Sequence, residues 1–269
     1  MKIHPTAVIH PKALLADDVE VGPYSVVGEH VSIGKGTKVS SHVCIDGWTE
    51  IGERCELHPF VSVGGPPQHM QYKNEATKVV IGHDNVLREY VTVNRATVQG
   101  GGTTTIGDHN FLMAYVHVAH DCHLGDHLIL ANAASLAGHI TIGDHAIIGG
   151  LSGIHQYVRI GAYSMVGGCC ALGQDLPPFM RAAGGYRARM YGLNSIGLRR
   201  HGFSADRIST LKQAYEVLFR SGHRVAEAVK LARQSFGQHQ DVMQVVDFME
   251  GTKRGICRSV GKEQESEDD

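Results

Sequence analysis

The stretch IGDHNFLMAYVHVAHDCHLGDHLILANAASL, residues 106–136, carries an aliphatic residue at every sixth position. The same spacing runs from Ile3 to Leu172 with two interruptions. A period of six is neither the roughly 3.6 of a helix nor the alternation of a single strand, so each unit is a short strand followed by a corner. Three units make one triangular coil of eighteen residues with the aliphatic side chains inside. We therefore expect a mainly β protein, a parallel β-helix whose coils stack about 4.8 Å apart and whose corners use glycine or small residues.

Two segments interrupt the repeat, residues 64–80 (GGPPQHMQYKNEATKVV) and 94–105 (NRATVQGGGTTT). Long loops on a rigid scaffold often carry functional groups, although simple tolerated insertions are the alternative interpretation. Beyond Pro177 and Pro178 the period of six disappears. We therefore expect a β-helix domain over 1–176 with loops at 64–80 and 94–105, a connector over 177–201, and a small all-α domain over 202–269 that ends in a disordered acidic tail, QESEDD.

The C-terminal segment has the pattern of amphipathic helices. Ser204 is a suitable N-cap, and Gly222 a suitable C-terminal stop. Four apolar residues between them share one helical face: Ile208, Leu211, Tyr215 and Leu218. Two more helices are expected at about 224–236 and 240–250.

Composition excludes several classes of protein. With 269 residues and a formal net charge of −2, the chain lacks the strongly basic character of a general nucleic-acid binder. It contains no apolar run long enough for a membrane span, and its start, MKIHPTAVIH, does not resemble a signal peptide. The six cysteines show no CxxC spacing, which favours reduced thiols over disulfides or a zinc site. We expect a cytoplasmic protein.

The eighteen-residue coil sorts the histidines by position. His109, His127 and His145 are spaced by eighteen within repeated GDH triplets, so they should form a structural ladder along one edge. Four irregular histidines instead gather near another edge within about 10 Å of axis: His117, His120, His139 and His155. A neutral imidazole can accept a proton near pH 7, which makes these four a candidate site. His123 fits neither group and is expected to be a surface residue.

Asp121 directly follows His120. A carboxylate that accepts one imidazole N–H would leave the other ring nitrogen free as a general base. Because adjacent residues need not face each other, this partnership is only a hypothesis from sequence.

Six segments appear in an order and spacing that closely resemble those of bacterial UDP-N-acetylglucosamine O-acyltransferases. They are AYVHVAHDC (114–122), LAGH (136–139), GIHQ (153–156), TVQGGG (97–102), QDLPP (174–178) and GLRRHGF (197–203). The resemblance covers nearly the whole chain and implies a left-handed β-helix followed by a helical domain. It also implies transfer of an (R)-3-hydroxyacyl group from acyl carrier protein to the glucosamine 3-position of UDP-N-acetylglucosamine, the first step of lipid A synthesis.

By resemblance, His120 matches the general base and Gly138 the backbone N–H that binds the oxyanion. Gly138 is eighteen residues after His120, so the coil arithmetic also places it one coil away. Other family positions fall on residues expected to bind substrate: Gln68, His69 and Gln71 in the first loop, and His117, His139, His155, Gln156, Gly168, Asn194 and Arg200. Gly168 matches the position that limits acyl length, and a glycine there suggests a long chain.

The resemblance further implies a homotrimer with sites between neighbouring prisms, and no cofactor or metal. The expected partners are acyl carrier protein and the UDP-sugar, with no nucleic acid and no integral membrane segment. Basic residues are candidates for docking the acidic carrier, although each could equally be a solvated surface charge. They are Arg199, Arg200, Arg207, Lys212 and Arg220.

The chain departs from the family pattern in the first loop. It reads QHMQY at 68–72 where QDLKY is usual, so an acidic residue and a lysine associated with the hexose are missing. Ile196 replaces a common glutamate, and His201 replaces a common second arginine. These changes raise the hypothesis that the acceptor is the 3-amino sugar nucleotide, which would give an amide product.

Three other functions fit the repeat. An acetyl-CoA-dependent sugar acetyltransferase shares the hexads but not the helical segment. A trimeric zinc carbonic anhydrase would need a second histidine five positions after His117, where Cys122 stands. A purely structural scaffold would leave the loops and the four irregular histidines unexplained.

Overall fold

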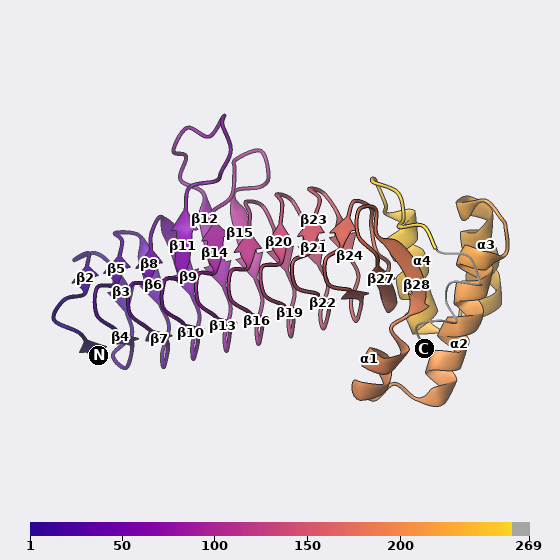
Figure 1. Ribbon diagram of the computed structural model, residues 1–269, viewed down its shortest axis with the longest axis horizontal. Helices are drawn as coiled ribbons and strands as arrows, with labels where there is room; N and C mark the ends of the chain where they lie inside the picture. Colours follow the sequence, from indigo (N-terminus) through magenta and orange to yellow (C-terminus); the bar gives the residue numbers. More distant parts are fainter. Residues whose placement is uncertain (260–269) are drawn as a thin grey trace.

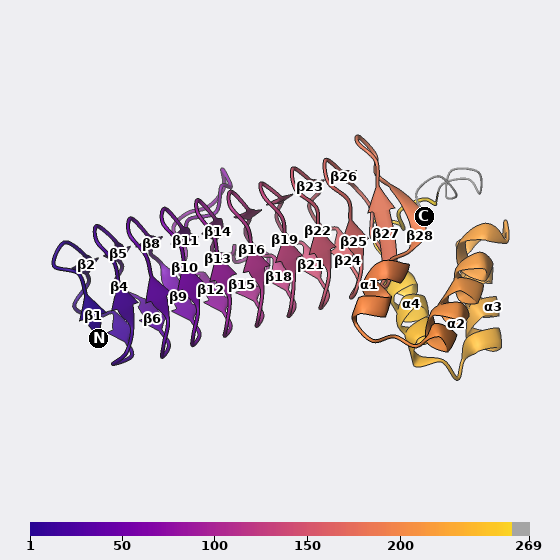
Figure 2. The same ribbon diagram turned by 60° about the horizontal axis from the view of Figure 1, so that its bottom comes forward.

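The structure, a computed structural model, describes residues 1–259 and is an elongated triangular prism with a helical segment at one end (Figure 1). The acidic tail predicted at 264–269 lies outside the described residues. Figure 2 shows the successive coils side by side along the prism axis, with the helices beyond the last coil. The predicted parallel β-helix is confirmed, because strands from successive coils pair in parallel on each of three faces.

The first sheet has eleven strands. In pairing order they are β1 (Lys2–Ile3), β4 (Glu20–Val21), β7 (Lys38–Val39), β10 (Glu56–Leu57), β13 (Val86–Leu87), β16 (Phe111–Leu112), β19 (Ile129–Leu130), β22 (Ile147–Ile148), β25 (Met165–Val166), β27 (Met180–Ala183) and β28 (Arg189–Leu193).

The second and third sheets complete the prism. The second contains β2 (Val8–Ile9), β5 (Val26–Val27), β8 (Cys44–Ile45), β11 (Ser62–Gly65), β14 (Thr92–Asn94), β17 (His117–Val118), β20 (Ser135–Leu136), β23 (Gly153–Ile154) and β26 (Ala171–Leu172). The third contains β3 (Leu14–Leu15), β6 (Val31–Ile33), β9 (Trp48–Ile51), β12 (Lys78–Ile81), β15 (Thr103–Ile106), β18 (His123–Leu124), β21 (Thr141–Ile142) and β24 (Arg159–Ile160).

The aliphatic residue of each hexad points into the prism, as the period of six predicts. Leu112, Leu130 and Ile148 are paired across consecutive coils and are completely buried. Burying one such side chain contributes about 1.5–3 kcal/mol. The core is therefore a continuous aliphatic column that holds the coils in register.

Glycine serves a different purpose from the one expected. The left-handed residue at most corners is not glycine, since Tyr90 (φ 61°) and His127 (φ 57°) adopt this conformation. Glycines instead follow the inward aliphatic residue, where coils approach most closely. A Cβ on Gly52 would lie 2.4 Å from the carbonyl oxygen of Gly82 in the next coil. Glycine is required there for close approach, and not for positive φ.

We call the three corners first, second and third: they join the first sheet to the second, the second to the third, and the third to the first. The two insertions project from the second corner, between β11 and β12 and between β14 and β15 (Figure 1). The residues at both ends of each insertion belong to the paired strands. The free loops therefore span 66–77 and 95–102 and are shorter than the segments expected from sequence. The loops therefore lie beside the coils that carry His120 and His139.

The segment expected as a connector contains regular structure. β27 pairs in parallel with β25 and antiparallel with β28, so the first sheet continues past the last hexad. The short helix α1 (Ser195–Arg200) follows, with the Asn194 side chain accepting from the Gly197 N–H. The period of six gave no signal for these elements because none of them repeats.

The helices follow as α2 (Ala205–Tyr215), α3 (Val225–Phe236) and α4 (Gln240–Glu250), with a π-helical turn, η1 (Glu216–Arg220), extending α2. Ser204 caps α2 through the Arg207 N–H. The segment is fixed to the last coil: the Thr252 hydroxyl donates to buried Asp175 at 2.8 Å, and the Arg159 guanidinium lies over the Phe248 ring at 4.1 Å. Within residues 1–259, no helix combines the length and apolar character needed to cross a bilayer.

Candidate active site

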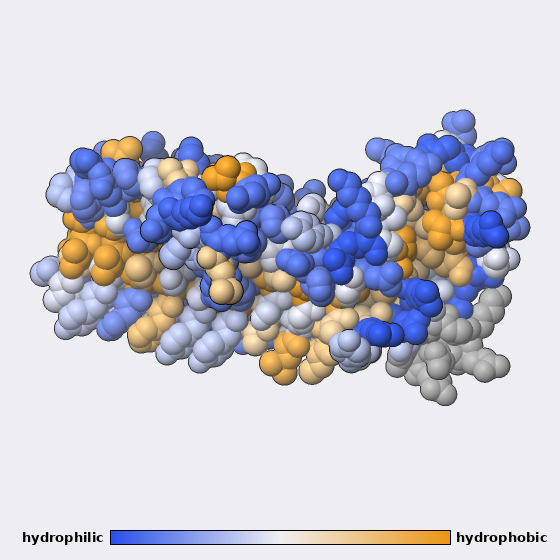
Figure 3. Space-filling view, turned by 90° about the horizontal axis from the view of Figure 1, so that it is seen from above, coloured by the Kyte–Doolittle hydropathy of each residue, from blue (hydrophilic) through white to orange (hydrophobic). Residues whose placement is uncertain are grey.

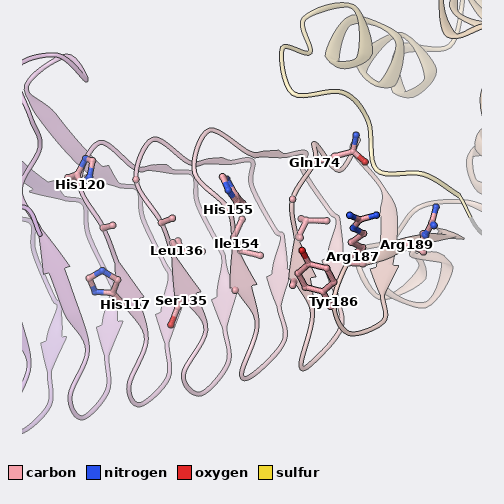
Figure 4. A pocket seen from close by; sticks show the side chains of 18 of the residues that line it. His117, His120, Ser135, Leu136, Ile154, His155, Gln174, Tyr186, Arg187 and Arg189 are labelled. Atoms are coloured by element: carbon pink, nitrogen blue, oxygen red, sulfur yellow. The ribbon is translucent and has the colours of Figure 1, made fainter. Parts of the chain in front are cut away.

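A groove with a cavity of about 890 Å³ runs along the outer face of the second sheet. Its floor consists of outward residues on successive strands, paired in register as His117, Ser135, Gly153 and Ala171. Three of these four are small, and three strand spacings of about 4.8 Å extend the floor by about 14 Å. Figure 4 shows His117 and His120 at one end of this groove and Tyr186, Arg187 and Arg189 at the other.

At the head of the groove His120 forms a pair with Asp121. The His120 Nδ1 lies 2.7 Å from Asp121 Oδ2, so the hypothesis that these neighbours face each other is confirmed. Asp121 turns back toward His120 because it occupies the left-handed corner position (φ 61°), a conformation that aspartate tolerates better than most residues. A carboxylate only accepts, so Nδ1 carries the proton and Nε2 is free to act as a base.

Asp121 is buried and receives two further hydrogen bonds. The Thr97 backbone N–H donates to Oδ1 at 2.8 Å, and the Thr97 hydroxyl donates to Oδ2 at 2.7 Å. Burial by itself raises the pKa of Asp121, but the hydrogen bonds from His120 and Thr97 outweigh it, so the pKa lies below its ordinary value. Asp121 is therefore a carboxylate at neutral pH.

Gly138 lies one coil from His120, where the eighteen-residue spacing puts it. A Cβ on Gly138 would come within 2.5 Å of the His120 Cε1 atom, so only glycine leaves room for the ring. Among the described residues, the Gly138 N–H has no hydrogen-bond acceptor. The site thus combines an imidazole that is held by a carboxylate with a free backbone N–H.

His117 and His139 lie beside this pair, and His155 lines the same groove two coils further along. His117 Nδ1 lies 2.7 Å from the Thr92 hydroxyl, and burial and the nearby His120 lower the pKa of His117. The His139 ring meets the His120 ring edge to face at 5.1 Å, and burial lowers the pKa of His139 although Asp121 opposes the effect. Both imidazoles are neutral at pH 7, so they can supply hydrogen bonds without adding positive charge.

The first loop reaches the same place. The His69 ring lies 5.5 Å from the His120 ring, and Gln68 lines the groove. Gln71, further along this loop, is exposed and does not line the groove. Of the three residues expected in this loop, His69 therefore lies against His120 and Gln68 lines the groove.

Seven of the ten residues expected to bind substrate do not line the groove of this chain: His69, Gln71, His139, Gln156, Gly168, Asn194 and Arg200. Gln156 is exposed at the second corner beside His155, and Gly168 at the first corner. Asn194 is buried and caps α1, its side chain donating to the Tyr163 carbonyl at 3.0 Å, while Arg200 is exposed on the same helix. A single chain brings together only part of the expected set.

The groove also contains residues that sequence reasoning missed. The far end is formed by Gln174, Tyr186, Arg187, Arg189 and Arg258. Thr97 was missed as well, because it reaches Asp121 from a loop outside the repeat. The segment TVQGGG belongs to the family resemblance, but the sequence does not specify which residue this segment contacts.

The thiol nearest the pair cannot serve as the nucleophile at neutral pH. Cys122 is completely buried, and burial raises its pKa to about 12. His123, by contrast, is exposed and lies against the Thr105 hydroxyl, as expected for a surface residue.

His120, Asp121 and His139 place three potential metal-ligand atoms within 4.8 Å of one another. Two imidazoles and a carboxylate are ligands that zinc accepts. However, Asp121 Oδ2 already accepts from His120 and from the Thr97 hydroxyl, and a metal would replace both hydrogen bonds. The present geometry suits proton transfer better than coordination.

The basic residues proposed for carrier docking differ in their contacts. Arg207 forms two 2.8 Å hydrogen bonds with Asp241, which partly neutralises its charge. Arg199, Arg200 and Lys212 are exposed on α1 and α2. These three remain the better candidates.

The chain is similar to known proteins over nearly its whole length. Residues 175–257 match a family profile described as UDP-N-acetylglucosamine O-acyltransferase, domain 2, and residues 103–138 match the bacterial transferase hexapeptide profile. The chain is 51% identical over 257 residues to an acyl-[acyl-carrier-protein]–UDP-N-acetylglucosamine O-acyltransferase of Thermodesulfovibrio yellowstonii, covering 96% of this chain and 99% of that one. A similarly named protein of Sulfurihydrogenibium sp. is 55% identical, with 97% and 96% covered.

Solved structures of related enzymes have the same fold as this chain. LpxA from Acinetobacter baumannii superposes with a TM-score of 0.93 at 43% identity, covering 95% of this chain and 99% of that one. The Arabidopsis UDP-N-acetylglucosamine acyltransferase gives 0.85 at 32% identity, with 95% and 100% covered. These matches confirm the expected left-handed β-helix with a helical C-terminal segment.

Proposed function

Because the chain belongs to the UDP-N-acetylglucosamine O-acyltransferase family, we propose that it transfers an (R)-3-hydroxyacyl group from acyl carrier protein to the glucosamine 3-position of UDP-N-acetylglucosamine. This reaction is the first step of lipid A synthesis and takes place in the cytoplasm. The observation that carries the proposal is the His120–Asp121 pair beside the free Gly138 N–H, at the head of a groove with a floor of small residues.

In this mechanism His120 is the general base. Its Nδ1–H donates to Asp121 while Nε2 removes the proton from the sugar 3-hydroxyl. The sugar oxygen attacks the thioester carbonyl carbon, and the negative charge that develops on the carbonyl oxygen is stabilised by the Gly138 N–H. The C–S bond then breaks, and His120 returns its proton to the thiolate of the carrier. The products are the 3-O-acyl sugar nucleotide and the free thiol.

Asp121 supports both halves of this cycle. As a carboxylate it favours the tautomer with Nε2 free, and it stabilises the imidazolium that exists between the two proton transfers. His117 and His139, which are neutral, are proposed to orient the sugar through hydrogen bonds. Gln68, His69 and His155 complete this side of the site.

The groove floor provides a place for the acyl chain. Ser135, Gly153 and Ala171 project little from the second sheet, and buried aliphatic side chains lie directly beneath them. Tyr186 and Arg187 bound the far end, where a polar, charged surface would disfavour further methylene groups.

We propose that the active assembly is a homotrimer. Gly168, Asn194 and Arg200 do not line this chain's groove, so their proposed contacts with the acyl chain and nucleotide require a neighbouring protomer. A row of aromatic side chains in ring-to-ring contact lies exposed along the first corner, and we call it the aromatic row: Tyr24, His42, Phe60, Tyr90 and Tyr115. Exposed apolar residues of this density are typical of an interface. Figure 3, viewed from the side of the two loops, shows further apolar surface over the N-terminal coils.

Replacing two residues of the aromatic row tests the trimer. Tyr90→Glu combined with Tyr115→Glu should convert the trimer to monomers in sedimentation velocity and abolish turnover, because the site would lose its neighbouring half. Val225→Glu, at an equally exposed apolar position on α3, is the control and should sediment like the unmodified protein. A double variant that stays trimeric would contradict the use of this corner.

Product analysis tests the reaction itself. The purified protein is incubated with UDP-N-acetylglucosamine and a mixed pool of (R)-3-hydroxyacyl carrier proteins, and the products are identified by mass spectrometry. We expect one predominant 3-O-acyl product, and none when the carrier is replaced by acetyl-CoA. Transfer from acetyl-CoA alone, or stoichiometric zinc with loss of activity on chelation, would overturn the proposal.

The 3-amino sugar nucleotide is a second candidate acceptor. Gln71 stands where relatives of this pattern carry a lysine, and a neutral amide does not repel a protonated amine as a lysine would. The two acceptors should be compared with the same acyl carrier protein. A clear preference for the hydroxyl sugar eliminates this candidate, and a clear preference for the amine replaces the ester product by an amide.

A further inference from the structure

Residues 97–100 of the second loop form a seat for the buried carboxylate of Asp121. Thr97 donates to both carboxylate oxygens, from its backbone N–H to Oδ1 and from its hydroxyl to Oδ2. Asp121 is 1% exposed and Thr97 4% exposed, so these hydrogen bonds are shielded from water. Charge-assisted hydrogen bonds in such an environment fix geometry more strongly than exposed ones.

Gly100 completes the seat by leaving space for the carboxylate. A Cβ on Gly100 would lie 2.0 Å from the Asp121 Cγ atom, and its backbone N–H donates to the Thr97 hydroxyl at 3.1 Å. The next glycine differs, because a Cβ on Gly101 would meet no atom within 4 Å. The two neighbouring glycines therefore serve different purposes, close packing at Gly100 and a positive φ of 99° at Gly101.

The seat is itself held in place by Arg95, which lies two residues before Thr97. Arg95, 8% exposed, donates to the Tyr72 hydroxyl and to the Gly64 carbonyl, both at 2.8 Å. Tyr72 belongs to the first loop, which brings His69 against His120. Residues 95–100 thus connect the first loop to the carboxylate that orients His120.

From this geometry we infer that Thr97 is a positioning residue, which holds Asp121 against the His120 Nδ1–H so that Nε2 faces the groove. This inference rests on the proposed function, because it assigns Thr97 a role only if His120 is the base. Without the Thr97 hydroxyl, His120 is the one side chain that still donates a hydrogen bond to Asp121. The Asp121 carboxylate then gains freedom to rotate away from the imidazole. Thr97 does not contact the substrate in this scheme.

Substitution of Thr97 tests the inference. In Thr97→Val we expect kcat to fall by about 10- to 100-fold through misplacement of the base, with little change in KM for the nucleotide sugar. The acid limb of the kcat/KM profile should move to lower pH, in the same direction as in Asp121→Asn, because a carboxylate that no longer faces the imidazole stabilises its protonated form less. Thr97→Ser retains the hydroxyl and should restore most of kcat.

Thr37→Val is the matched control for loss of a buried hydroxyl. Thr37 is fully buried, donates to the Gly52 carbonyl at 2.9 Å and accepts from the Cys55 N–H at 3.0 Å, in a coil without site residues. The Thr37→Val variant should lower Tm, as Thr97→Val does, while its kcat and pH profile stay unchanged. Wild-type kcat and pH profile in Thr97→Val, with His120→Ala inactive, would overturn the positioning role alone. Full activity of His120→Ala would instead overturn the proposed function.

The two glycines give a second measurement that does not depend on Thr97→Val folding. Gly100→Ala should displace the Asp121 carboxylate and lower kcat by about tenfold or more, whereas Gly101→Ala strains the same loop without touching Asp121 and should leave kcat nearly unchanged. Equal losses in both variants, or no loss in Gly100→Ala, would overturn the inference.

Discussion

Two rows of histidines run along different corners of the same prism. His109, His127 and His145 form a ladder at the third corner, with ring centroids 4.7–4.8 Å apart and nearly parallel planes. At the second corner His120 and His139 meet edge to face at 5.1 Å. Both corners use a left-handed residue, so the backbone alone does not distinguish a ladder from a candidate catalytic site.

The order of aspartate and histidine makes the difference. In the ladder the sequence is Asp–His, the histidine takes the left-handed position, and the preceding carboxylate accepts a backbone N–H from the previous coil, as Asp126 does from Asp108. At the second corner the order is His–Asp, Asp121 takes the left-handed position, and its carboxylate accepts from His120. The second loop then covers Asp121, which removes it from water. One reversed dipeptide and one insertion convert a structural corner into a candidate acid–base site.

Removing one imidazole from each row gives the largest expected contrast. His120→Ala should lower kcat by about 10²–10⁴-fold, the usual contribution of a general base. His127→Ala removes a ring from the ladder and should leave kcat unchanged. Steady-state kinetics with circular dichroism as a folding check would measure both, and near-normal turnover in His120→Ala would refute its role.

Glycine substitutions give the next contrast. Gly138→Ala would place a Cβ 2.5 Å from the His120 ring, so we expect kcat to fall by about 10²-fold as the base is displaced. Gly125→Ala, in the ladder, would place its Cβ 2.2 Å from Asp144 Oδ1. It should lower Tm without lowering kcat, and a comparable loss of kcat in both variants would remove the distinction between the rows.

The smallest expected effect is the response of stability to acid, which the two rows should share. The pKa is lowered in folded His139 and in folded His145, in each case first by burial. A histidine with a lowered pKa stabilises the fold at pH above its unfolded value of about 6.5, and this contribution is lost as pH falls through the folded pKa. Tm should therefore decrease from pH 7.5 to 5.

Single replacements measure the contribution of each row to this decrease. His139→Gln and His145→Gln should each make the decrease of Tm with pH shallower, as followed by differential scanning calorimetry. His127→Gln serves as the comparison within the ladder, and a decrease as steep as in the unmodified protein in both test variants would contradict the assignment. Kinetics are not needed for this measurement, so it is independent of the site's chemistry.

Much of this arrangement could be predicted from sequence because the coil is regular. Spacing by eighteen put Gly138 beside His120 and aligned the ladder, and both relations hold because hydrogen-bonded strands fix the register. The arithmetic fails across the insertions, where paired residues are thirty apart between Ile51 and Ile81 and twenty-five apart between Ile81 and Ile106. Contacts made by a loop, such as Thr97 with Asp121, follow no period and could not be derived.

The sequence by itself determined the repeat, the inward aliphatic column and the corner at which the irregular histidines gather, because each depends only on local spacing. Tertiary structure alone decided that Asp121 faces His120, that Thr97 and Gly100 enclose this carboxylate, and that Gly168, Asn194 and Arg200 lie outside the groove. These features depend on where loops and the C-terminal elements close onto the prism. Such closures are set by packing and buried hydrogen bonds between residues far apart in sequence, and a periodic pattern contains no information about them.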